Sequence, residues 1–333
     1  MKKSLVTLTF TALALSAMAI PGFMRRSSAS AEGKLNSSQT SMAPDTSAAA
    51  QDATFAAQDS GVVMPKVGIY ALDQNNTLFI LRPGALSFKQ LVRVRGVNGN
   101  LIGLDFRPAD RKLYALSDAD IVYTINLDNN LGAATQVSTV SPGFDGGFQS
   151  LMDFNPVANA LRLIGSNDQN YALVNSNGGN LNATAVQTAM NYRAGDVNAG
   201  RNPSISAGSY TNNNNGAQVT IFYAIDSARD TFVTIDPPAT GGSSATATGA
   251  LRTIGRLVTP RGELINFSPT GDFDIFTIAG NNFIVGVSGA RLFTIGLDQI
   301  NPNQALGTTK KVVVRSIPLF GPSGFIDVAI PTF

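Results

Sequence analysis

Four aspartates recur at the same place in short apolar segments, and they are the residues of this chain with the most chemical potential. The segments are Leu104-Asp105-Phe106, Met152-Asp153-Phe154, Phe273-Asp274-Ile275 and Ile326-Asp327-Val328, and a degenerate copy, Gly208-Ser209-Tyr210, lies between the second and the third. Carboxylates gathered at one point repel one another unless a cation binds between them. Calcium is the candidate cation because it takes six to eight oxygen ligands in irregular geometry. The sequence therefore marks Asp105, Asp153, Asp274, Asp327 and Ser209 as candidate metal ligands.

The spacing of these residues predicts the elements that carry them. Successive positions lie 48, 56, 65 and 53 residues apart, which are the lengths of four-stranded propeller blades with variable loops. Short β-branched or aromatic runs fill each interval between Asn, Asp and Gly turns, for example residues 112–116, 122–126 and 134–139. No apolar period of helical length appears after Met64. We expect an all-β propeller of antiparallel blades, with each aspartate on an innermost strand.

The two ends of the chain complete one blade. Residues 68–72, 77–81 and 88–94 match the second, third and fourth strands of a blade that has no inner strand before it, whereas residues 325–329 form an inner strand with nothing after it. Pairing them closes the ring and leaves no open edge at either end. The count is then five blades, and six is the alternative if residues 262–267 form extra strands. In the repeat that begins at Asp274 we expect residues 311–315 to be the outer strand.

Two roles are open for the aspartates. The innermost strands of a propeller surround its axis, so the carboxylates either converge on a cation there or accept hydrogen bonds from backbone amides of the adjacent blade. A weaker calcium-loop pattern, Asp196 and Asn198 before Gly200, lacks the distal glutamate of such a loop, which favours a simple turn.

The chain contains few of the residue types that enzymes use for catalysis. The chain has no His and no Cys, and Glu32 and Glu263 are its only glutamates. Triads built on histidine, thiol nucleophiles and the usual transition-metal sites are therefore excluded. We expect a non-catalytic binding or scaffold domain, and the alternative is a calcium-dependent propeller hydrolase or lactonase with an aspartate as its base.

The first part of the chain has the composition of a targeting segment and a tether. Lys2 and Lys3 precede an apolar stretch that ends at Pro21-Gly22, so residues 1–23 are predicted to be a signal peptide. Residues 24–64 are rich in Ser, Ala, Gln and Thr, which predicts a disordered tether. Residues 65–333 are the expected propeller. The protein is then exported to the periplasm or the extracellular space, without a transmembrane anchor after cleavage.

The charge of the expected propeller is nearly balanced. Residues 65–333 contain 19 basic and 18 acidic side chains, so electrostatics provides no argument for a nucleic acid partner. We expect a monomer that binds a protein, a glycan or a small molecule on its loop-lined faces.

Several ordered motifs resemble a known family. They are Gly68-Ile-Tyr-Ala-Leu72, Gly103-Leu-Asp-Phe-Arg-Pro108, Lys112-Leu-Tyr-Ala-Leu116, Asp153-Phe-Asn-Pro156, Asp196-Val-Asn-Ala-Gly200, Tyr210-Thr-Asn-Asn213 and Leu292-Phe-Thr-Ile295. Together they are similar to the signature runs of the secreted bacterial family called domain of unknown function 4394. The resemblance implies export and an all-β repeat fold, and it implies no established activity, ligand or catalytic residue.

Overall fold

The computed structural model describes residues 61–175, 181–239 and 241–331. The expected signal peptide, residues 1–23, and most of the expected tether, residues 24–64, lie outside the described residues. The described part is built of strands and two short 3-10 helices, η1 (Asp128–Asn130) and η2 (Thr246–Thr248). No helix in this part has the length and apolarity needed to cross a membrane.

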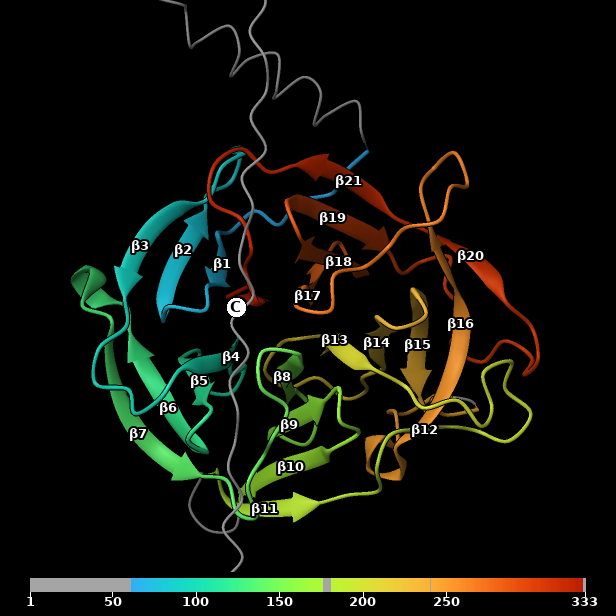
Figure 1. Ribbon diagram of the computed structural model, residues 1–333, viewed down its shortest axis with the longest axis horizontal. Coiled ribbons are helices and arrows are strands. Elements are labelled where there is room, and N and C mark those ends of the chain that lie inside the picture. The colour runs from blue at the N-terminus through green and yellow to red at the C-terminus, as the bar shows by residue number, and fades with distance from the viewer. Residues whose placement is uncertain (1–60, 176–180, 240, 332–333) are drawn as a thin grey trace, which may run out of the picture. The chain divides into compact units, whose positions relative to one another are not determined.

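Five antiparallel sheets stand around a common axis, so the chain folds as a five-bladed β-propeller (Figure 1). Blade 1 consists of β22 (Asp327–Ala329), β1 (Ile69–Leu72), β2 (Thr77–Leu81) and β3 (Lys89–Arg93). Blade 2 consists of β4 (Leu101–Phe106), β5 (Leu113–Ser117), β6 (Ile121–Asn126) and β7 (Ala133–Thr139). Blade 3 consists of β8 (Ser150–Asn155), β9 (Ala160–Gly165), β10 (Asn170–Asn175) and β11 (Leu181–Val186).

The remaining two blades follow the same order from the axis outward. Blade 4 consists of β13 (Ile205–Tyr210), β14 (Phe222–Asp226), β15 (Thr231–Ile235) and β16 (Ala250–Val258), with β12 (Asn191–Tyr192) and β20 (Lys310–Val313) added at its outer edge. Blade 5 consists of β17 (Asp272–Ile278), β18 (Asn281–Ser288), β19 (Arg291–Gly296) and β21 (Arg315–Pro318). The inner strands β22, β4, β8, β13 and β17 contact one another in that circular order.

The predicted closure of the ring by the two chain ends is confirmed. Strand β22 pairs antiparallel with β1, and Leu72 lies opposite Asp327 in their register. The prediction of five blades is also confirmed, because residues 262–267 contribute only an isolated bridge between Val258 and Leu264.

One strand assignment was wrong. Residues 311–315 were expected to form the outer strand of the blade that begins at Asp274, but β20 pairs in parallel with β16 on blade 4. The outer strand of blade 5 is β21, which pairs antiparallel with β19. Val312 is 1% exposed and packs into the core between blades 4 and 5. The run of β-forming residues is therefore divided between two blades, and no local pattern marks the division.

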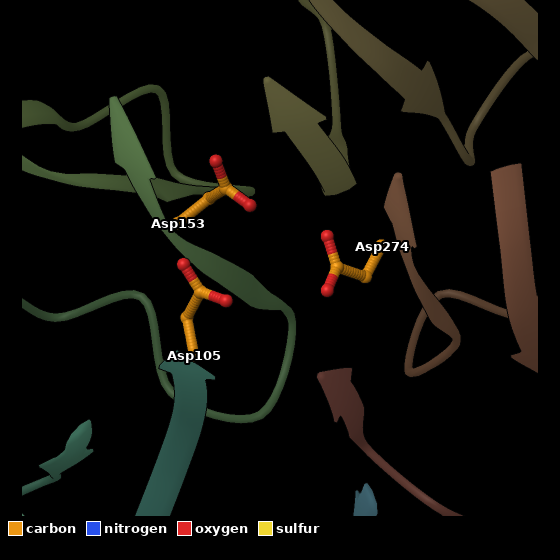
Figure 2. A group of neighbouring side chains, drawn as sticks. All are labelled: Asp105, Asp153 and Asp274. Atoms are coloured by element: carbon orange, nitrogen blue, oxygen red, sulfur yellow. The ribbon is translucent and has the colours of Figure 1, made fainter. Parts of the chain in front are cut away.

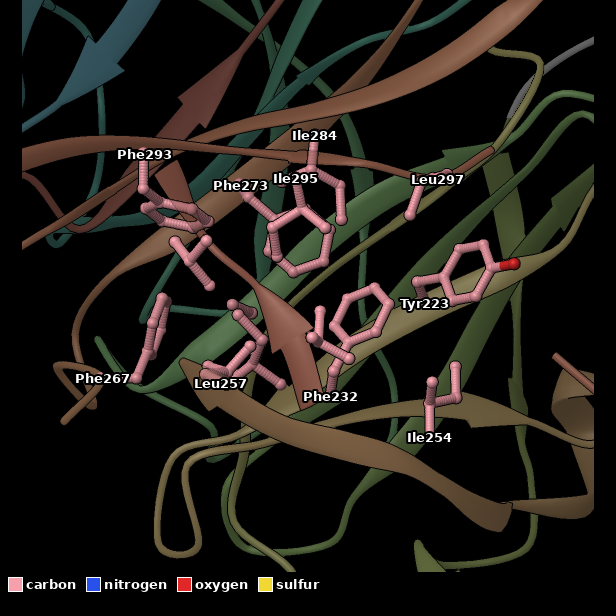
Figure 3. Close-up of a cluster of buried hydrophobic side chains, with 14 of the residues drawn as sticks. Tyr223, Phe232, Ile254, Leu257, Phe267, Phe273, Ile284, Phe293, Ile295 and Leu297 are labelled. Carbon is pink, nitrogen blue, oxygen red and sulfur yellow. The ribbon is translucent and has the colours of Figure 1, made fainter. Parts of the chain in front are cut away.

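The hydrophobic core is divided into clusters that lie between adjacent blades. The cluster between blades 4 and 5 includes Phe232 of β15, Phe273 of β17 and Ile284 of β18 (Figure 3). Both faces of the inner and middle strands are thus buried, which explains why these strands have almost continuous apolar sequences. Val62, Val63 and Met64 also pack against the cluster between blades 5 and 1.

Candidate functional site

The inner strands bring the predicted aspartates to the propeller axis. Asp105 lies on β4, Asp153 on β8, Asp274 on β17 and Asp327 on β22, and each is between 1% and 3% exposed. Ser209 takes the equivalent place on β13 and is fully buried. Because side chains alternate along a strand, one face of each inner strand presents these polar groups while the other supplies apolar side chains to the cores between blades.

Hydrogen bonds that these aspartates accept join every blade to the next. The backbone N–H of Phe154 donates to Asp105 at 2.7 Å, and that of Tyr210 donates to Asp153 at 3.0 Å. The links onward are the Ser209 hydroxyl to Asp274 at 3.0 Å, the Ile330 N–H to Asp274 at 2.7 Å, and the Leu104 N–H to Asp327 at 2.7 Å. Blades 2, 3, 4, 5 and 1 are therefore connected in sequence, and the last link returns to blade 2.

A fifth axial carboxylate, Asp272, was missed by the sequence reasoning. It lies two residues before Asp274 on β17, is 2% exposed and accepts a hydrogen bond from the Gly208 N–H at 3.1 Å. The signal was present, because residues i and i+2 of a strand point to the same face. The side chain of Asp327 lies close to Asp272 and, after burial, is a main cause that raises the pKa of Asp272.

Burial dominates the acid–base behaviour of this group. Burial raises the pKa of Asp274 to about 6 and that of Asp327 to about 8. The pKa of Asp105 is raised well above its usual range by burial first and then by the charges of Asp153 and Asp274. Burial likewise raises the pKa of Asp153 and of Asp272. Among the described residues, no lysine or arginine is one of the main influences on these pKa values, and burial, the largest influence, favours the neutral carboxyl group.

Three of the predicted ligands lie close enough to share one cation. Asp105, Asp153 and Asp274 each offer a carboxylate oxygen, and these oxygens lie within 4.8 Å of one another (Figure 2). Calcium–oxygen distances of about 2.3–2.6 Å allow such a separation. Asp327 and Ser209 are outside this three-residue group, so further ligands would be waters or other oxygens. The donor set, all oxygen and all buried, suits a hard cation.

The second oxygen-rich segment has a structural role. Asp196 accepts hydrogen bonds from the N–H of Asn198 at 2.9 Å and from the N–H and hydroxyl of Thr253, each at 2.7 Å. The first of these is the turn that the sequence favoured. The two bonds from Thr253 attach the segment before β13 to β16. Both carboxylate oxygens of Asp196 are thus used within blade 4.

The chain belongs to a family as well as to the class of five-bladed propellers. The family model described as domain of unknown function (DUF4394) matches residues 77–313, so this protein is a member of that family. No curated protein matches the sequence.

Solved structures resemble the chain only distantly. The β-propeller domain of Cps50 (Swd1) from Myceliophteria thermophila is 12% identical, with 75% of this chain and 70% of that one covered and a TM-score of 0.37. The major allergen Mala s 1 of Malassezia sympodialis is 8% identical over 78% of each chain, with a TM-score of 0.41. YCF48 bound to D1 peptide is 11% identical, with 72% and 62% covered and a TM-score of 0.33.

Proposed function

We propose that this protein is an exported, non-catalytic binding propeller that holds a protein, glycan or small-molecule ligand on one of its faces. The observation that carries the proposal is the state of the axial carboxylates. They are buried and accept hydrogen bonds from neighbouring blades. A general acid or base must be within hydrogen-bond reach of its substrate, and these groups are enclosed by the blades they join.

A pocket at the end of the inner strands is the preferred ligand site. Its volume is about 360 Å³, within the usual range for small-molecule sites. Apolar side chains of Val67, Phe276 and Ile330 line it, together with Lys66 and Asn213. The amide group of Asn213 is buried and has no hydrogen-bond partner among the described residues. A buried unpaired amide destabilises a protein unless a ligand or water satisfies it.

The Asn213→Leu variant tests this site. Replacing the amide with an apolar group of similar size leaves the melting temperature unchanged or higher, because no partner is lost. Glycan and peptide arrays probed with the wild type identify a ligand, and the variant then retains it more weakly. Asn303→Leu is a control, since Asn303 is not among the residues that line the pocket. A wild-type protein that retains no array member, or a variant that binds equally well, contradicts the proposed site.

The alternative, a calcium-dependent hydrolase, is favoured by one observation, the convergence of Asp105, Asp153 and Asp274. It requires EDTA to lower the melting temperature, calcium to restore it, and a chromogenic ester or lactone to be cleaved only with calcium. Asp105→Asn abolishes the calcium response if these carboxylates bind the ion. Absence of both the thermal response and the cleavage removes the hydrolase from consideration and leaves the binding propeller in place.

Export is tested independently of the ligand. Fractionation of the source cells is expected to recover the protein from the periplasm or the medium, and N-terminal sequencing of the mature chain would identify the cleavage site. Recovery from the cytoplasm with an intact N-terminus contradicts export. Size-exclusion chromatography with light scattering tests the expected monomer.

A further inference from the structure

A groove on blade 4, away from the axial carboxylates, collects three arginines. Its volume is about 590 Å³, and Arg201, Arg229 and Arg256 all line it. Arg201 lies in the segment between β12 and β13, Arg229 in the turn between β14 and β15, and Arg256 on β16. Three separate segments thus bring guanidinium groups to one place in a domain whose overall charge is almost balanced.

One of the three arginines is held in place from behind. Arg229 donates to the fully buried carboxylate of Asp226 at 2.9 Å and to the Asn202 carbonyl at 2.7 Å. Its guanidinium carbon also lies 5.8 Å from the centre of the Tyr192 ring. Both of these hydrogen bonds use Nη1, so the Nε and Nη2 donors remain for a ligand.

The side chains of the other two arginines are available to a ligand. Among the described residues, the exposed side chains of Arg201 and Arg256 have no hydrogen-bond or ion-pair partner. Asp230 is the only acidic residue that lines the groove, and one of its carboxylate oxygens already accepts the Phe267 N–H at 2.8 Å. Counting Asp226 behind Arg229 and Asp230 in the lining, these five residues carry one net positive charge.

We propose that this groove binds a singly charged tetrahedral oxyanion carried on a sugar-sized group, that is, a phosphodiester or a sulfate monoester. Guanidinium groups donate paired hydrogen bonds to such oxyanions. Three of them approaching from different segments suit a group with several oxygens better than a planar carboxylate. A single negative charge neutralises the groove, and its volume accommodates more than a bare ion. The site is independent of the axial pocket proposed above.

Amide NMR titration of the purified protein tests the proposal with four probes. Glycerophosphoglycerol supplies a phosphodiester, glucose 6-sulfate a sulfate ester, glucuronate a carboxylate and glucose an uncharged sugar. The two esters are expected to shift groove amides saturably, and the tighter ester identifies the source of the oxyanion. Equal binding of glucuronate, or equal shifts with glucose, overturns the assignment.

Three variants locate the site. Arg201→Gln and Arg256→Gln each weaken ester binding by about tenfold, the effect expected when one charge-assisted hydrogen bond is lost. Arg261→Gln is the matched control, because Arg261 is also exposed but does not line the groove. Both test positions are exposed, so their melting temperatures stay at the wild-type value. Unchanged affinity in both test variants, or an equal loss in Arg261→Gln, overturns the proposal.

Discussion

Replacing Asp274 with asparagine removes a buried carboxyl group whose pKa burial raises to about 6. An aspartate in the unfolded chain titrates near pH 4. Between about pH 4 and pH 6 the folded protein therefore keeps a proton that the unfolded chain has lost, and stability falls with rising pH wherever the folded state binds more protons. This contribution is fully present below about pH 4 and is lost once the pH has risen through 6.

The size of the effect follows from the two pKa values. Each pKa unit corresponds to about 1.4 kcal/mol, so the free energy of unfolding of the wild type falls by about 3 kcal/mol relative to Asp274→Asn across this window. The charge of Asp274 also raises the pKa of Asp105 and of Asp153, which adds to the fall in the same direction. The variant also weakens the hydrogen bonds that Ser209 and Ile330 donate to Asp274, and this loss adds a constant offset to the difference in free energy of unfolding between the two proteins. That offset is nearly independent of pH, because neither donor titrates.

The assay is urea unfolding of both proteins at pH 4.5, 5.5, 6.5 and 7.5 in the presence of EDTA. EDTA matters because a bound cation stabilises the ionised carboxylates and reverses the sign of the pH dependence. The exposed Asp145, changed to asparagine, serves as the control and shows no such trend. The reasoning is refuted if the difference in free energy of unfolding between wild type and Asp274→Asn stays constant with pH. It is also refuted if the wild type gains stability relative to the variant as the pH rises.

Three further predictions concern how the blades are held together. Gly103→Ala lowers the free energy of unfolding by about 1–3 kcal/mol, because its Cβ would lie 2.8 Å from the Cβ of Met152; wild-type stability in urea would contradict this. Arg162→Met destabilises by about 1–3 kcal/mol in the same assay, since buried acceptors on blades 3 and 4 lose their donor, and a more stable variant would oppose it. Truncation after Gly324 removes β22 and abolishes cooperative thermal unfolding, as followed by circular dichroism. A sharp transition in the truncated protein would show that closure of the ring is dispensable.

Much of the fold could be read from local patterns. Each inner strand is recognisable by an aspartate or Ser209 between apolar residues, because one face of that strand lies at the axis and the other face packs into a core between blades. The closure of blade 1 was also predictable. The first blade lacks an inner strand and the C-terminal segment supplies one, so pairing the two leaves no open strand edge.

Features that depend on contacts between distant segments could not be read in this way. Strand β20 joins blade 4 because Val312 fills a space in the core between blades 4 and 5, and its sequence would suit either blade. The arginine groove unites residues 201, 229 and 256, which carry no shared motif. Asp272 was overlooked because its period-two relation to Asp274 has meaning only once β17 is known to be an inner strand.

The amino-acid sequence by itself determined the architecture of this protein, since repeated spacing and alternation are local properties that specify strands and their order. It also named four of the five carboxylates at the axis, all but Asp272. Only the tertiary structure decided what those carboxylates do: each one accepts a hydrogen bond from another blade, and three of them come within reach of one cation. Hydrogen bonding and charge repulsion depend on distances of a few ångströms between residues some 50 or more positions apart, and those distances exist only after the ring has closed.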